Sequence, residues 1–357
     1  MWRVIVAVVA LSALAVPAFA QPRDPRWEIE VYGGASLPNP PSDPVVTLPP
    51  TGTPLTTSSP IFPSRAISSW FFGDGADLLN DVNAAFALAP RVAPLDDALG
   101  ELDIGGDRSG LFGVRVRRAL SSRVFAEFSV ESASGSMELP AALADAGEAA
   151  RGSFETAFRA LVTTGPFSNV AVSATRAVQR GSLRELSATA ALNVRFNAGG
   201  GLEPYLTFGG GVHGAAGTAP VMSLEGTYRF DVANTFNVNE TDRAAVRLER
   251  SITPVAVLGG GVWRGLSDRW GLRVDGRLTV GPGGYRLLID ADPTVRTSGP
   301  ASFIESFTHP SIQFSNDPAT GRRSSLSGPT VTGFRALEQD GLGTRFTITA
   351  GVTVRFN

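Results

Sequence analysis

The closing stretch of the chain, Arg345-Phe-Thr-Ile-Thr-Ala-Gly-Val-Thr-Val-Arg-Phe356, alternates apolar residues with polar or small ones without a break. Side chains two residues apart lie on the same face of a β-strand, so this period of two predicts a strand with one apolar face. That face consists of Phe346, Ile348, Ala350, Val352, Val354 and Phe356. Because the pattern recurs along a chain that begins with a secretion signal, we expect the apolar face to contact lipid.

The first twenty residues have the pattern of a secretory signal peptide. Arg3 supplies the positive charge, residues 4–16 the apolar run, and Ala18-Phe-Ala20 the small-x-small cleavage site. The apolar run is shorter than the roughly 20 residues that a membrane-spanning helix needs, and Pro17 ends it. We therefore expect residues 1–20 to be a signal peptide and residues 21–357 to be the exported domain.

The composition limits the kinds of protein that this chain can be. With 357 residues, of which 43% are hydrophobic, it can form one large domain or two ordinary ones. Its 40 Gly and 25 Pro favour turns over long helices. A net charge of -2 provides no electrostatic footprint for nucleic acid. The lack of Cys excludes disulfides, Cys-based zinc sites and a lipid-modified N-terminal Cys, and we expect no cofactor and no metal.

Seven further segments alternate like the last one, and the lengths of their connections indicate the fold. The segments are residues 27–35, 111–118, 124–131, 186–196, 205–213, 254–263 and 270–280. Three short turns alternate with four long inserts, which are residues 36–109, 132–183, 215–253 and 281–343. This asymmetry is typical of transmembrane β-barrels, whereas four such loops are unusual in a compact soluble domain. The sequence predicts an all-β, antiparallel, up-and-down transmembrane barrel of about eight strands, and a soluble periplasmic β-sandwich is the alternative.

The inserts themselves contain patterns of secondary structure. Residues 76–88 and 139–161 have the spacing of amphipathic helices, so we expect long extracellular loops that are partly helical. Residues 221–230 and 245–252 resemble strands that could prolong their neighbours as a hairpin beyond the membrane. Whether such a hairpin raises the number of barrel strands from eight to ten is left open.

Three segments resemble a known family. They are Trp27-Glu-Ile-Glu-Val-Tyr-Gly-Gly34, Leu202-Glu-Pro-Tyr-Leu-Thr-Phe-Gly-Gly-Gly211 and the C-terminal strand. Together they are similar to the small outer-membrane β-barrel proteins, such as the membrane domain of the outer membrane protein A family. The resemblance implies a place in the Gram-negative cell envelope. It also implies that the aromatic residue near the C-terminus, Phe356, serves as an insertion signal for the barrel-assembly machinery.

On the predicted strands, many of the residues that alternate with the apolar ones are charged. A charge that faces lipid at the midplane costs roughly 2–4 kcal/mol, so these side chains are expected to point into the lumen. An interior of eight strands is just wide enough for side chains to fill, which favours a structural network of ion pairs over a narrow ion-conducting path. The predicted network is Arg115, Arg117, Glu127, Glu131, Arg195, Arg273, Asp275, Arg277, Arg345 and Arg355.

Two other motifs have weak functional meaning. Gly209-Gly-Gly-Val-His-Gly214 fits G-x-G-x-x-G, but it lies in a strand pattern with no helix after it, so nucleotide binding is not expected. We expect its glycines to lie beside Gly259–Gly261 of the next strand, where the barrel bends or a bulky side chain lies flat. His213 is interpreted as a polar histidine near the outer rim, with Ser223 or Glu225 beyond it, and no catalytic residues are expected.

These observations lead to three hypotheses about function. The first is an outer-membrane protein, not an enzyme, whose extracellular loops have a structural or surface-interaction role. Its expected partners are outer-membrane lipid, the barrel-assembly machinery and an unknown extracellular ligand, without nucleic acid. The second is a small porin-like channel for ions or solutes. The third is an enzyme with its site at the rim of the barrel.

Overall fold

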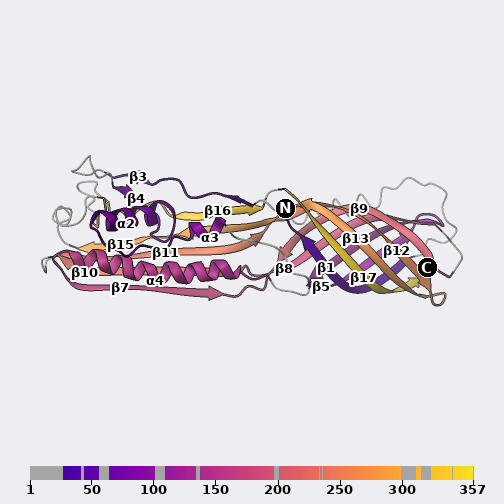
Figure 1. Ribbon diagram of the computed structural model, residues 1–357. Coiled ribbons are helices and arrows are strands. Elements are labelled where there is room, and N and C mark those ends of the chain that lie inside the picture. Colours follow the sequence, from indigo (N-terminus) through magenta and orange to yellow (C-terminus); the bar gives the residue numbers. More distant parts are fainter. Residues whose placement is uncertain are drawn as a thin grey trace.

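The computed structural model contains a closed antiparallel barrel of eight strands (Figure 1). It describes residues 27–41, 44–55, 64–100, 109–133, 137–196, 201–232, 234, 236–298, 311–314, 323–339 and 341–356, so the predicted signal peptide lies outside the described residues. Around the barrel the strands follow each other in chain order, as in an up-and-down barrel. They are β1 (Trp27–Asn39), β5 (Ser109–Ala119), β6 (Val124–Ala133), β8 (Arg184–Arg195), β9 (Glu203–Ala216), β12 (Thr253–Gly265), β13 (Trp270–Pro282) and β17 (Leu342–Phe356).

The eight segments with alternating sequence are these eight strands, which confirms the antiparallel barrel and its strand number. Several strands run one to four residues further than the alternation indicated, so the connections between them are slightly shorter than the predicted inserts. No helix among the described residues is long and apolar enough to cross a membrane.

The barrel wall is apolar outside and polar inside. In β1, Glu28 and Glu30 are buried in the interior, whereas Ile29 and Val31 point outward with 39% and 63% of their surface exposed. The neighbouring strands place apolar residues opposite these positions, so the outward side chains form a continuous surface. On β17 the outward Phe346, Ile348 and Val352 are 42–50% exposed, and no described element covers them.

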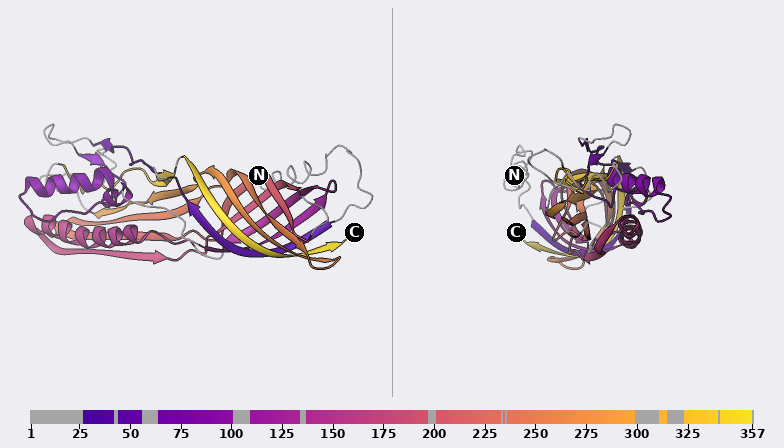
Figure 2. Two further views of the ribbon diagram at one scale, coloured as in Figure 1. Left: turned by 45° about the vertical axis from the view of Figure 1, so that its right-hand side comes forward. Right: turned by 90° about the vertical axis from the view of Figure 1, so that its left-hand side faces the viewer.

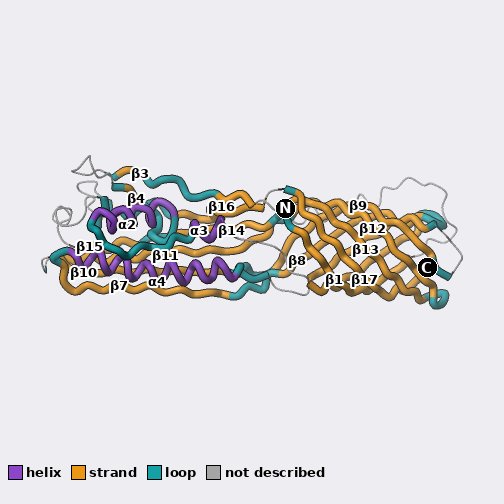
Figure 3. The backbone as a smooth tube through the Cα atoms, viewed as in Figure 1, coloured by secondary structure: helices purple, strands orange, loops and turns teal. Residues whose placement is uncertain are grey.

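A second sheet continues the barrel wall at one end (Figure 3). Its order is β2 (Pro44–Val46), β16 (Val331–Gln339), β14 (Tyr285–Ala291), β11 (Phe236–Arg250), β10 (Val221–Val232) and β7 (Phe167–Gln179), and β15 (Thr294–Ser298) pairs with β11. The order of the adjoining barrel strands is the same, namely β1, β17, β13, β12, β9 and β8. Each of these six barrel strands is joined to its counterpart by a break of only a few residues. The strand-like runs 221–230 and 245–252 therefore belong to β10 and β11 of this sheet, and not to the barrel.

Three helices cover one face of the second sheet. They are α2 (Gly73–Ala85), α3 (Asp96–Gly100) and α4 (Ala141–Thr164), and a small pair of strands, β3 (Thr53–Pro54) and β4 (Arg65–Ala66), lies beside them. We call the second sheet and these elements the sheet–helix domain. It forms one end of an elongated molecule, and the barrel forms the other (Figures 1 and 2). Apolar side chains from α2, α4, β10 and β11 form its core, where Phe158 stacks on Tyr228 with ring centroids 4.1 Å apart.

Helix α4 takes the place that continuations of β5 and β6 would have occupied. It follows β6 in the chain and packs against β7 and β10. Its Glu155 accepts a 2.8 Å hydrogen bond from the Ala174 amide, and Arg159 donates a 3.0 Å bond to the Val172 carbonyl. Because an uncovered strand edge is a site for unwanted pairing, α4 protects the backbone of the edge strand β7.

Candidate functional site

The ten predicted charged residues all belong to the interior of the barrel. Most are almost fully buried, and Glu131, Arg345 and Arg355 keep a small exposure towards the ends. The structure joins them with carboxylates that the prediction left out. Glu28 and Glu30 lie on the inward face of β1, and Glu203 pairs with Arg195 at 2.9 Å. Glu28 and Glu30 alternate in the polar phase of the first strand, so the same rule would have identified them.

Arg273 lies at the centre of this interior network. Its guanidinium contacts three carboxylates: Glu127 at 2.7 Å, Asp275 at 3.1 Å and Glu30 at 3.3 Å. Its Nη2 also donates a 2.9 Å hydrogen bond to the Asn193 amide oxygen. Removing charges from water is costly, and several partners for each charge are needed to offset that cost.

The other arginines complete the network around the same carboxylates. Arg115 bridges Glu30 at 3.1 Å and Asp275 at 3.0 Å, and Arg277 bridges Glu127 at 2.6 Å and Asp275 at 3.1 Å. Further towards the short turns, Glu28 pairs with Arg117, Arg195 and Arg355 at 2.9–3.3 Å. These contacts fill the cross-section of the barrel with ion pairs.

Aromatic rings inside the barrel lie over inward-facing glycines. A Cβ atom added to Gly261 would lie 2.5 Å from the Tyr205 hydroxyl oxygen, and one added to Gly113 would lie 2.5 Å from the Tyr32 ring. The Tyr205 hydroxyl and the Val274 carbonyl oxygen therefore occupy the space that a side chain at Gly261 would need. The expectation that the two glycine trios lie side by side is wrong, because Gly209 pairs with Val257 and Gly259 pairs with Thr207.

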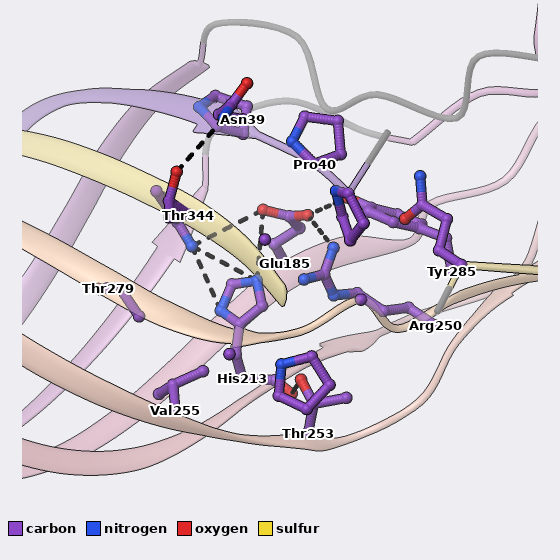
Figure 4. A pocket seen from close by; sticks show the side chains of 18 residues that line it. Asn39, Pro40, Glu185, His213, Arg250, Thr253, Val255, Thr279, Tyr285 and Thr344 are labelled. Atoms are coloured by element: carbon purple, nitrogen blue, oxygen red, sulfur yellow. Dashed lines mark hydrogen bonds and ion pairs between the residues drawn. The ribbon is translucent and has the colours of Figure 1, made fainter. Parts of the chain in front are cut away.

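A second polar cluster occupies the end of the barrel next to the sheet–helix domain (Figure 4). Glu185 lies between His213 and Arg250 there: its Oε2 is 3.6 Å from His213 Nε2, and its Oε1 accepts a 2.6 Å bond from Arg250. The Tyr285 hydroxyl donates to the same Oε1. Nη1 of Arg345 lies 3.3 and 3.4 Å from the two ring nitrogens of His213. We call this group the mouth cluster, and it borders a small pocket of about 70 Å³.

The surroundings of His213 differ from those expected from the sequence. Ser223 and Glu225 lie on the exposed face of β10, where Glu225 pairs with Arg243 at 2.9 Å, and neither contacts the histidine. Instead, Ser187 is its register partner on β8, and the Ser187 hydroxyl hydrogen-bonds to Nδ1. Ser187 and His213 are 26 residues apart and joined only by strand pairing, so no local motif marks them.

Two carboxylates are buried in the sheet–helix domain without a cationic partner among the described residues. Glu240 on β11 accepts hydrogen bonds from the Tyr228 hydroxyl and, at 2.8 Å, from Ser324. Asp242 accepts from the Ser69 hydroxyl at 3.0 Å and from the Trp70 amide at 2.6 Å. Desolvation raises the pKa of each carboxyl to about 7. These carboxyls tie loops of the first and last inserts to the sheet.

Comparison with known proteins does not add to this description. No protein-family model matches the chain, and no curated protein matches it. The described residues contain no group of three or more His, Cys, Asp or Glu side chains that could hold a metal ion. Arguments about function therefore rest on the barrel interior, the mouth cluster and the surfaces of the two parts.

Proposed function

We propose that this chain is an outer-membrane protein whose barrel lies in lipid and whose sheet–helix domain has a structural or surface-interaction role. The observation that carries the proposal is the polarity of the wall, which is apolar and exposed outside and charged and buried inside. In water this arrangement would expose apolar side chains and bury charges, both at a cost. In a bilayer the same arrangement is favourable, since a lipid-facing Arg or Lys costs roughly 2–4 kcal/mol at the midplane.

The height of the apolar surface supports the same proposal. On β1 the outward apolar residues run from Trp27 to Leu37. Ten residues at about 3.3 Å each, tilted by about 40°, give a height of about 25 Å, which is the usual apolar band of such barrels. Arg118 and Arg264 lie near the short turns, and Arg118 stands over the Trp27 ring at 5.4 Å. Charges and aromatic rings at that level suit a membrane–water interface.

The ends of the barrel suggest its orientation. The short turns and the C-terminal end of β17 lie at one end, and the sheet–helix domain lies at the other. Outer-membrane barrels have short periplasmic turns and long extracellular connections. We therefore assign the sheet–helix domain to the cell surface, where it would meet an extracellular ligand. The C-terminal strand, with Phe356 as its insertion signal, would bind the barrel-assembly machinery.

Cysteine labelling tests this orientation, because the natural chain contains no Cys. Ser173 is exposed on β7 of the sheet–helix domain, and Ser122 is exposed in a short turn of the barrel. In intact cells a membrane-impermeant maleimide should label Ser173→Cys and should label Ser122→Cys only after permeabilisation. The reverse pattern would refute the surface assignment. Labelling of both variants in a detergent-free soluble fraction would refute the membrane assignment itself.

The filled interior favours this role over a porin-like channel. Arg115, Arg117 and Arg273 are each about 1% exposed and lie across the lumen, so the wild-type barrel should not conduct. Planar-bilayer recordings of the purified, heat-modifiable protein should show no stable single-channel steps. Reproducible steps of fixed size would favour the channel instead.

A further inference from the structure

Two parts of the chain that are far apart in sequence lie together over the helix-covered face of the second sheet. They are residues 64–72 of the first insert and residues 311–314 and 323–328 of the last insert, and we call them the cover. The Ile67 amide donates a 2.6 Å hydrogen bond to the Ser325 carbonyl, and the Gly328 amide donates a 2.8 Å bond to the Ile67 carbonyl. The two parts of the cover are therefore bonded into one unit.

Two carboxyl groups of β11 bind this cover to the sheet. Glu240 and Asp242 are two residues apart, so both side chains lie on the same face of the strand, and both are fully buried. Asp242 bonds to the first-insert part of the cover, through the Ser69 hydroxyl and the Trp70 amide. Glu240 bonds to the last-insert part, through the Ser324 hydroxyl. Each carboxyl thus binds one part of the cover.

The hydrogen bonds around Glu240 are complete only when this carboxyl carries a proton. The Ser324 hydroxyl has one proton but two oxygen neighbours, the Glu240 carboxyl at 2.8 Å and the Gln313 carbonyl at 3.0 Å. An ionised Glu240 can only accept that proton, which leaves the Gln313 carbonyl without it. A protonated Glu240 donates to Ser324, and Ser324 then donates to Gln313. On the other side, the Trp70 indole donates to the Tyr228 hydroxyl at 3.2 Å, and Tyr228 donates to Glu240.

The surroundings of the two carboxyls offer no positive charge among the described residues. Their register partners are Tyr228 and Val295 beside Glu240, and Gly226 beside Asp242. Oδ1 of Asp242 is buried without a hydrogen-bond partner among those residues, so an ionised Asp242 would hold an unsolvated negative oxygen. The charged groups of the packed elements are engaged elsewhere or exposed: Arg65 pairs with Asp74, Asp96 bonds to the Gly73 amide, Glu155 and Arg159 bond to the backbone of β7, and Arg323 is exposed.

We propose that Glu240 and Asp242 form a proton-controlled clasp, which holds the cover on the sheet while both are protonated and releases it when both lose their protons. Ionisation would place two negative charges on one face of β11, about 7 Å apart, inside an apolar core. Movement of the cover relieves this cost, because water then reaches both carboxylates. Burial raises the pKa of each carboxyl to about 7, so the change falls near neutral pH.

The sheet beneath the cover does not depend on the clasp. Strands β10 and β11 pair without a break from Val221–Arg247 to Val232–Phe236, and these backbone bonds do not involve the two carboxyls. Helix α4 is also bonded to β7 independently of them. We therefore expect the cover to open as a unit while the sheet stays folded. Opening would expose Tyr228 and Phe230, which pack against Phe314 of the cover with ring centroids 5.8 and 5.1 Å away.

Hydrogen exchange of the purified full-length protein in detergent, measured by mass spectrometry at pH 5.5 and pH 8.0, tests this proposal. The amides of Ile67, Ser325 and Gly328 report on opening, because each is hydrogen-bonded within the cover. After correction for the intrinsic chemical exchange rate, they should exchange faster at pH 8.0, by about 30-fold for each carboxyl. This factor follows if each carboxyl has its ordinary pKa in the open cover and a pKa of about 7 in the closed one. Amides between β10 and β11 should stay protected at both pH values.

Glu240→Gln is the informative variant, because its neutral amide can donate to Ser324 and accept from Tyr228, as the protonated acid does. It should remove one factor of about 30 from the pH effect. Glu225→Gln, exposed on the neighbouring strand, should behave like the wild type. If Glu240→Gln does not fold, the wild-type comparison decides the question.

Three outcomes would overturn the proposal. The first is equal corrected exchange of the cover at the two pH values. The second is an unchanged pH effect in folded Glu240→Gln. The third is an equal loss of protection in the cover and between β10 and β11 at pH 8.0, because that result indicates unfolding of the whole sheet–helix domain and not release of the cover.

Discussion

Replacing the buried Glu240 with Gln should stabilise the sheet–helix domain at neutral pH. Burial raises the pKa of this carboxyl from its ordinary value of 4.5 to about 7. Between these two values the unfolded chain carries an ionised Glu240 while the folded domain keeps its proton, so stability falls as the pH rises from about 4.5 to about 7. At about 1.4 kcal/mol per pKa unit, the loss is about 3 kcal/mol. Gln does not titrate, and its amide oxygen can accept a hydrogen bond from one of the Tyr228 and Ser324 hydroxyls while its NH2 group donates to the other.

Pulse proteolysis across a urea series, at pH 5 and at pH 7.5, measures this effect in the purified protein. The wild-type sheet–helix domain should unfold at lower urea at pH 7.5, and Glu240→Gln should remove about 2 kcal/mol of that difference, because part of the total loss already occurs below pH 5. Asp242, whose pKa is also raised to about 7, should account for much of the remainder. Glu225→Gln is the control, because Glu225 is exposed on the neighbouring strand. If Glu240→Gln kept the full pH dependence, the idea that Glu240 is protonated in the folded domain would be wrong.

Three further substitutions test the barrel. Arg273→Ala leaves three buried carboxylates without their shared partner and should destabilise the barrel in urea by about 3–5 kcal/mol, whereas the exposed Arg264→Ala should have little effect. Ile348→Arg places a charge on the outward face and should make the free energy of insertion into lipid vesicles less favourable by roughly 2–4 kcal/mol. The control Ser173→Arg, in the sheet–helix domain, should insert like the wild type. Equal insertion of both variants would contradict a lipid-facing wall. Gly261→Val would collide with Tyr205 and the backbone of the next strand and should lower the melting temperature, unlike Gly152→Ala, which points into open space.

The barrel could be predicted from the sequence because its two faces have opposite polarity. Each of its strands has an apolar outward face and a polar face towards the lumen, so the period of two is visible, as between Phe346 and Phe356. The helices α2 and α4 were also indicated by their apolar spacing. In contrast, β14 was not predicted, because Leu287, Leu288 and Ile289 are all buried and the alternation disappears. The strand β7 was missed because its outward residues are small and polar.

The alternation of residues along each strand predicts which side chains face the interior of the barrel. It does not predict the mouth cluster. A charge on the polar phase of a strand is expected to point into the lumen, and Arg115, Arg273 and Asp275 are buried there and paired with one another. Contacts of His213 depend on which residues of β8 lie opposite it and on how far Tyr285 reaches from the second sheet. Both depend on strand register and on the strand order of the sheet–helix domain, and neither leaves a signal in the local sequence.

Six short chain connections join strands of the barrel to strands of the sheet–helix domain, and this arrangement has a mechanical consequence. A surface domain carried on one flexible loop can swing freely, and a pull on it is borne by one stretch of chain. Here a pull would be shared among six covalent connections and passed into the hydrogen-bonded ring below them. If the barrel lies in a bilayer as we propose, a partner bound at the far tip would therefore tilt the whole barrel and would not merely bend a flexible connection.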